Sequence, residues 1–107
     1  MDILIRTDGV TLTDSLRDDV HDKTGRVEQY ATGALRARVL LGRVTARRAP
    51  GQYLVRVLIE VPGNDLSAEV TGPDPLAALD IVAETIERRL RKRKTKHLAR
   101  RHVAASH

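Results

Sequence analysis

The strongest strand pattern in this 107-residue chain is Tyr53-Leu54-Val55-Arg56-Val57-Leu58-Ile59-Glu60-Val61. Its apolar residues recur at every second position from Tyr53 to Val61, and charged Arg56 and Glu60 lie between them. A period of two predicts a β-strand with one buried face. Turn-forming sequences flank the strand, Ala49-Pro50-Gly51 before it and Pro62-Gly63-Asn64-Asp65 after it, so neighbouring strands should follow through short turns.

Three further segments predict strands. Residues 36–45 alternate imperfectly, and residues 66–71 alternate apolar with polar side chains before Gly72-Pro73 ends the pattern. Residues 2–6 form a short apolar stretch that also predicts a strand. The last three strands, being adjacent in sequence, should form an antiparallel meander.

One helical pattern precedes those three strands in the sequence, and another follows them. Thr13 or Asp14 is the expected cap of a first helix, in which apolar residues from Leu16 to Tyr30 recur on one face. Gly25 interrupts this pattern and costs about 1 kcal/mol of helix stability. Asp74 caps a second helix expected over residues 75–98, because the proline at position 75 is tolerated in the first turn.

The resulting order is β-α-β-β-β-α. It predicts an α+β protein, a two-layer sandwich in which two helices pack on one face of a four-stranded sheet. The length suits one domain, expected over residues 1–98. The apolar stripe of the second helix fades after Leu90, so we expect its second half to project from the body. Residues 99–107 are expected to form a basic, disordered tail.

Charge is divided unevenly along the chain. Residues 1–87 hold 10 Lys/Arg and 14 Asp/Glu, a balance of −4, whereas residues 88–107 hold nine Lys/Arg and no acid, a balance of +9. A basic end on an acidic body points to a polyanionic partner, of which nucleic acid is the commonest. With no Phe or Trp and two Tyr, the chain lacks the aromatic platforms of single-strand readers, which leaves recognition of backbone, shape and charge.

Other functional classes find little support. The chain has no cysteine and no phosphate-binding or nucleophile motif, and its four histidines lack the spacing of metal ligands. We therefore expect no enzyme activity, no cofactor, no metal and no small-molecule substrate. No apolar run is long enough to cross a bilayer, so we also expect no membrane partner and a soluble, intracellular protein.

The run Arg88-Arg89-Leu90-Arg91-Lys92-Arg93-Lys94-Thr95-Lys96 is the strongest functional signal. One or two cations at a helix end complement its dipole. Seven within nine residues repel one another and destabilise an isolated helix, so a bound polyanion should supply the opposing charge.

Four motifs in the expected order match a known family: Leu12-Thr13-x-x-Leu16-Arg17, Lys23-x-x-Arg26-Val27-Glu28-Gln29-Tyr30, Asp74-x-x-Ala77-Ala78-Leu79-Asp80 and Glu87-Arg88-Arg89-Leu90-x-Lys92-x-Lys94-x-Lys96. Through them, residues 1–96 resemble the ribosome hibernation promoting factor / ribosome-associated inhibitor A family. The resemblance implies the same β-α-β-β-β-α fold. It also implies a cytoplasmic protein that binds the small ribosomal subunit in the channel for messenger and transfer RNA and silences idle ribosomes.

The resemblance further implies which residues touch ribosomal RNA phosphates. Those that match the family pattern are Lys23, Arg26, Arg88, Arg89, Lys92, Lys94 and Lys96, and Arg91 and Arg93 extend the same surface. Long members of the family carry a second domain, so this chain is expected to be a short form. Short forms that favour ribosome pairing and short forms that block it are both compatible with the basic tail.

Two other interpretations fit the charge pattern. One is a module that binds double-stranded or otherwise structured RNA, although the double-stranded-RNA-binding architecture begins with a helix and this chain begins with a strand. The other is a regulator whose basic helix docks on an acidic protein.

Overall fold

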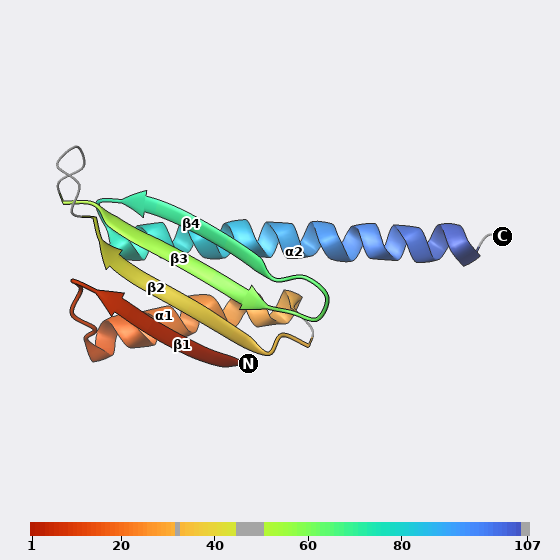
Figure 1. Ribbon diagram of the computed structural model, residues 1–107. Helices are drawn as coiled ribbons and strands as arrows, with labels where there is room; N and C mark the ends of the chain where they lie inside the picture. The colour runs from red at the N-terminus through yellow and green to blue at the C-terminus, as the bar shows by residue number, and fades with distance from the viewer. Residues whose placement is uncertain (32, 45–50, 106–107) are drawn as a thin grey trace.

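The predicted order of strands and helices is confirmed in the computed structural model, which describes residues 1–31, 33–44 and 51–105, with side chains up to residue 93. Along the chain, the elements are β1 (Asp2–Asp8), α1 (Asp14–Gly25), the 3-10 helix η1 (Arg26–Tyr30), β2 (Arg36–Arg43), β3 (Tyr53–Glu60), β4 (Leu66–Gly72) and α2 (Pro75–Ala105). Both helices lie behind the sheet in Figure 1, so the two-layer α+β arrangement is also confirmed.

The four strands form one mixed sheet in the order β1-β2-β3-β4. β2, β3 and β4 are antiparallel, as the short turns predict, and Val57 of β3 lies opposite Val39 on one side and Ala68 on the other. β1 pairs with β2 in parallel, with Ile5 opposite Val39. A parallel pair needs a crossover between its strands, and α1 provides it.

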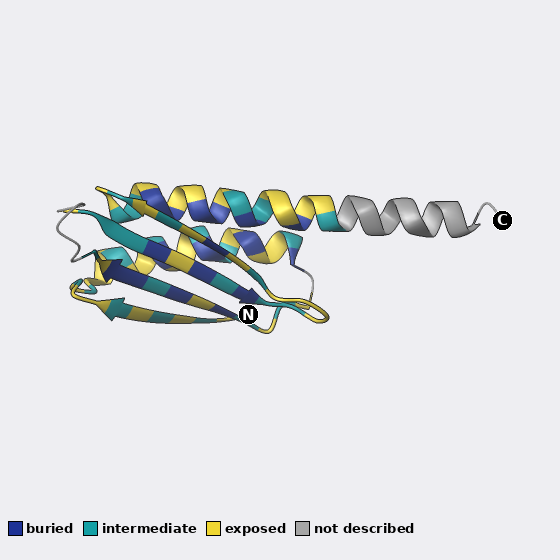
Figure 2. Cartoon of the chain, turned by 45° about the horizontal axis from the view of Figure 1, so that its top comes forward, coloured by how far each residue is buried: buried dark blue, intermediate teal, exposed yellow. Residues whose placement is uncertain are grey.

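The core lies between the sheet and the layer formed by α1, η1 and α2. Val55, Val57 and Ile59, which belong to the period-two row of β3, are each at most 2% exposed. The buried stripe of α2 covers this face of the sheet through Leu79, Val82, Ala83, Ile86 and Leu90. Figure 2 shows buried residues alternating with more exposed ones along β2 and β3 and recurring along both helices.

Side-chain caps begin both helices. Thr13 Oγ1 accepts a hydrogen bond from the backbone N–H of Leu16 at 3.1 Å, so Thr13 rather than Asp14 is the cap of α1. An Asp74 carboxylate oxygen accepts from the N–H of Leu76 at 3.0 Å. These bonds satisfy N–H groups that have no partner within the helix.

The first helical segment differs from the prediction in its last turns. α1 ends at Gly25, and the chain continues as the 3-10 helix η1. Gly25 weakens the α-helix at this point, and the tighter helix still places Val27 in the core and Tyr30 against it. The apolar pattern therefore identified the correct face but not the change of helix type.

α2 is longer than the sequence predicted, because its backbone remains helical to Ala105 and not only to residue 98. The segment has no Gly or Pro after position 75 and is rich in Ala, Leu, Arg and Lys, which are strong helix formers. Residues 106–107, and two other parts of the predictions, Thr45 and Ala49-Pro50, lie outside the described residues. The proposed division into a 1–98 domain and a 99–107 tail stays a prediction.

Thr24 offers a test of this core. Its side chain on α1 is buried, and its hydroxyl has no hydrogen-bond partner among the described residues. Replacing the hydroxyl with a methyl group in Thr24→Val removes an unsatisfied polar group, so the free energy of unfolding in urea should rise by about 1 kcal/mol. Thr24→Ser, which keeps the hydroxyl and loses the methyl group, should lower it by about 1 kcal/mol. A less stable Thr24→Val variant would show that the hydroxyl is satisfied.

Candidate nucleic-acid interface

Lys23 on α1 and Asp80 on α2 form an ion pair that joins the two helices. The Lys23 side chain is only 23% exposed, whereas Asp80 is half exposed. Next to this pair, Arg26 and Arg91 line a hollow together with Asp80, Glu84 and Glu87. Lys23 and Arg26, the two RNA-binding residues predicted on the first helical segment, therefore lie between the helices with carboxylates close to them.

Arg91 crosses from α2 to η1. Its guanidinium donates a hydrogen bond to the Tyr30 hydroxyl at 2.8 Å and lies over the Tyr30 ring, 4.6 Å from the ring centre. The hydrogen bond is the main reason that the pKa of Arg91 is raised above its usual value. Arg91 is thus a permanent cation that is already engaged with an aromatic ring.

Arg89 and Arg93 lie one helical turn apart and bind backbone carbonyls on the opposite side of α2. Arg89 donates to the carbonyl oxygen of Ser67 in β4 at 2.6 Å. Arg93 donates to the carbonyl oxygen of Asn64, in the turn between β3 and β4, at 2.9 Å. Both arginines therefore connect α2 to the β3–β4 hairpin.

Arg88 and Lys92 differ from Arg89, Arg91 and Arg93 because no hydrogen bond joins either of them to the sheet or to the first helical segment in the part of the chain described. Arg88 is 65% exposed and approaches Glu84, one turn earlier in the helix, with a nitrogen–oxygen distance of 3.7 Å. An exposed pair of this kind contributes little to stability and is easily exchanged for another anion. The side chains of Lys94 and Lys96 lie outside the described residues.

The predicted residues therefore do not form one uniform surface. Arg26 and Arg91 line one hollow between η1 and α2, and Lys23 pairs with Asp80 at its side. Arg89 and Arg93 instead bind the hairpin. Among the cations of the basic run whose side chains are described, those that make no hydrogen bond to the sheet or to η1 are Arg88 and Lys92.

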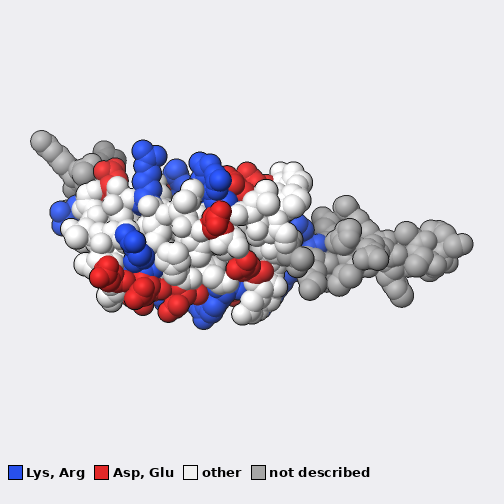
Figure 3. Space-filling model, turned by 90° about the horizontal axis from the view of Figure 1, so that it is seen from below, with Lys and Arg blue, Asp and Glu red and all other residues white. Residues whose placement is uncertain are grey.

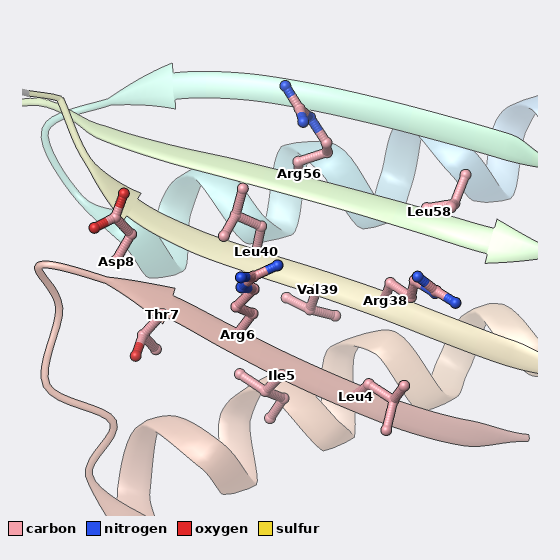
Figure 4. Close-up of a pocket in the computed structure, with 10 residues that line it drawn as sticks. All are labelled: Leu4, Ile5, Arg6, Thr7, Asp8, Arg38, Val39, Leu40, Arg56 and Leu58. Atoms are coloured by element: carbon pink, nitrogen blue, oxygen red, sulfur yellow. The ribbon is translucent and has the colours of Figure 1, made fainter.

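Sequence reasoning missed a second basic region, on the face of the sheet that the helices leave open. Figure 4 shows Arg6, Arg38 and Arg56 standing around a shallow hollow with three leucines, Leu4, Leu40 and Leu58. Glu60 pairs with Arg38 at 3.2 Å, and Glu69 pairs with Arg56 at 2.6 Å. The signal was present in β3, where Arg56 alternates with buried valines and so had to face away from the core.

Acidic side chains limit where a polyanion can approach. Asp14, Asp18 and Asp22 of α1 are exposed. Seen from below, the body shows mixed charge with a row of acidic side chains along the lower margin (Figure 3). Repulsion from these carboxylates disfavours binding along α1 and directs a polyanion toward the basic end of α2.

The described residues lack two kinds of feature. They contain no group of three or more His, Asp or Glu side chains placed to hold a metal ion. They also contain no helix long and apolar enough to cross a membrane.

The fold and the exposed cations define a small α+β protein that ends in a long basic helix. More particularly, the chain belongs to the family described as Sigma 54 modulation protein / S30EA ribosomal protein, whose sequence model matches residues 3–98. The family resemblance inferred from the four sequence motifs is thereby confirmed.

Similar proteins carry ribosome-related names. The chain is 34% identical over 92 residues to a ribosome hibernation promotion factor of Deinococcus radiodurans, covering 86% of this chain and 48% of that protein, so it spans about half the length of that relative. It is 29% identical over 96 residues to a ribosome hibernation promoting factor of Pseudomonas putida, covering 90% of this chain and 89% of the other. The N-terminal domain of Thermus thermophilus Protein Y superimposes with a TM-score of 0.73 at 26% identity, covering 86% and 98% of the two chains.

The Lys23–Asp80 pair yields a testable expectation. Asp80→Asn should release the Lys23 ammonium group, so affinity for a polyanion such as heparin or ribosomal RNA should rise, with up to one unit added to the salt slope. The free energy of unfolding should change by less than about 1 kcal/mol, because the pair is partly exposed to solvent. Asp18→Asn, which removes an equal charge from an exposed position of α1 where no ion pair is found within the described part of the chain, is the matched control. An Asp80→Asn variant that behaves like Asp18→Asn would show that Lys23 does not bind the polyanion.

Proposed function

We propose that this chain is a ribosome hibernation factor that binds the small ribosomal subunit in the channel for messenger and transfer RNA. In that position it would occupy the space that translation needs, and idle ribosomes would be silenced. Family membership and the names of its relatives support this role. The protein would act in the cytoplasm, by occupancy rather than by catalysis.

The observation that carries the proposal is the placement of the basic run on α2. The helix continues well past the end of the sheet in Figure 1, and Arg88 and Lys92 are exposed near the point where it leaves the body. A charged helix of this kind can enter a cleft lined with RNA. Contacts with phosphates release counterions, which drives binding without any reading of bases.

The contacts of α2 refine the proposed set of RNA-binding residues. Arg88 and Lys92 are the primary candidates, with Lys94 and Lys96 as their continuation along the sequence. Lys23 and Arg26 can contribute if RNA displaces their carboxylate neighbours. Arg89, Arg91 and Arg93 already have partners within the protein, so their N–H groups are only partly free.

The element order weighs against the double-stranded-RNA alternative. β1 precedes α1 and pairs in parallel with β2, whereas the double-stranded-RNA-binding architecture begins with a helix. An acidic protein partner would use the same cations. Competition with ribosomal RNA would separate these cases, since an acidic protein would be bound in the absence of ribosomes.

Sedimentation with purified ribosomal subunits tests the proposal. In a sucrose gradient at low salt, the protein should move with the small subunit and not with the large one. At high salt it should return to the top of the gradient, because phosphate contacts weaken as counterions compete. A protein that remains at the top at low salt, or that follows only the large subunit, would overturn the proposed partner.

The two exposed cations can be tested separately. Arg88→Gln with Lys92→Gln should weaken binding to the small subunit and lower the slope of log affinity against log salt by about two units, one per lost phosphate contact. Arg38→Gln with Arg56→Gln removes the same charge from the open sheet face and should leave the slope unchanged. If both pairs lower the slope equally, net charge rather than the basic end of α2 determines binding.

A further inference from the structure

Three arginines hold α2 from two sides at the place where it leaves the body. Arg91 binds Tyr30 of η1 on one side. On the other side, Arg89 and Arg93 bind the carbonyls of Ser67 and Asn64. We refer to Arg89, Arg91 and Arg93, with these contacts, as the arginine collar.

The collar lies where apolar packing ends. Leu90 is the last core residue of α2 among those whose side chains are described, and the helix then continues to Ala105, beyond the sheet in Figure 1. From position 91 to position 105 the helix is about 20 Å long, at 1.5 Å per residue. A tilt of roughly 10° at its base would move its end by about 4 Å, which exceeds the length of a hydrogen bond. The orientation of the basic end therefore depends on what holds the helix near Leu90.

The chemistry of the collar suits arginine. A planar guanidinium can donate to a hydroxyl and lie over an aromatic ring at once, as Arg91 does with Tyr30, whereas a lysine ammonium is a compact point charge. Carbonyl acceptors carry no charge, so Arg89 and Arg93 keep their full positive charge while they are fixed. The collar thus orients the helix without neutralising it.

We propose that Arg89, Arg91 and Arg93 are positioning residues, which set the direction of the basic end of α2 through Tyr30 and the β3–β4 hairpin instead of serving mainly as phosphate ligands. This inference extends the proposed ribosome-binding function. Only its expected effect on binding to the small subunit rests on that function. The orientation of the helix is a property of the isolated protein. It can be measured whether or not ribosomes are the partner.

Tyr30→Leu is the decisive variant because it breaks the Arg91 contact and leaves every cation in place. The chain has no cysteine, so spin labels can be placed uniquely at Thr71→Cys on β4 and Ala99→Cys on α2. Pulsed electron resonance should give a narrow distribution of distances in the parent chain. In Tyr30→Leu the distribution should broaden by several ångströms, and in Tyr30→Phe, which keeps the ring and loses the hydroxyl, by less. Tyr53→Leu, at the start of β3, is the matched control and should remain narrow.

Three results would overturn the proposal: a broad distribution in the parent chain, an unchanged width in Tyr30→Leu, or equal broadening in Tyr53→Leu. If Tyr30→Leu fails to fold, as judged by its thermal midpoint, Arg89→Gln with Arg93→Gln replaces it in the same measurement. That double variant should also broaden the distribution. An unchanged width would again overturn the proposal.

Binding to the small subunit supplies a second test. Arg89→Gln with Arg93→Gln should weaken binding about three- to tenfold with little change in salt slope, and Tyr30→Leu should do the same. Arg88→Gln with Lys92→Gln, the matched pair, should lower the slope by about two units. If the Arg89 and Arg93 changes lower the slope equally, they are phosphate ligands and the positioning role is wrong. If the parent chain binds no ribosome, the proposed function fails while the distance measurement still tests the collar.

Discussion

The packing of the apolar stripe of α2 on β3 and β4 determines where the other functional groups of the molecule lie. Ile86 and Leu90 are buried, and each such side chain contributes about 2 kcal/mol by leaving water. Because the stripe ends at Leu90, the charged residues that follow it in the sequence are carried beyond the edge of the core. The position of α2 on the sheet therefore determines which of its cations face solvent.

Much of the fold could be predicted from sequence because local patterns carry it. The period-two row of β3, the capping residues Thr13 and Asp74, and the turns around β3 each depend on neighbours within a few positions. The end of α2 could not be placed in this way, because the apolar stripe fades after Leu90 and no Gly or Pro follows to mark where the helix stops. Helix propensity continues after the stripe stops, and the helix continues with it to Ala105.

The candidate site was harder to predict from the sequence than the fold. The sequence identified the basic run but assigned all its arginines to one RNA-binding surface. The partners of Arg89, Arg91 and Arg93 are separated from them by 22, 61 and 29 residues, so only the tertiary structure brings them together. The same limit applies to Lys23, whose partner Asp80 lies on the other helix. Spacing along one helix gives the face of a residue, but the neighbouring element decides whether its charge is free.

The division of charge between the ends of this chain also has a kinetic meaning. Exposed carboxylates on α1 and a long basic helix that extends past the sheet make the molecule an electric dipole. In the field of a polyanion, such a dipole experiences a torque before any contact forms, so it turns its basic end forward during diffusion. Encounters then begin in nearly the correct orientation, and capture proceeds faster than a random search would allow. The exposed acids of α1 would contribute by determining which end of the molecule arrives first.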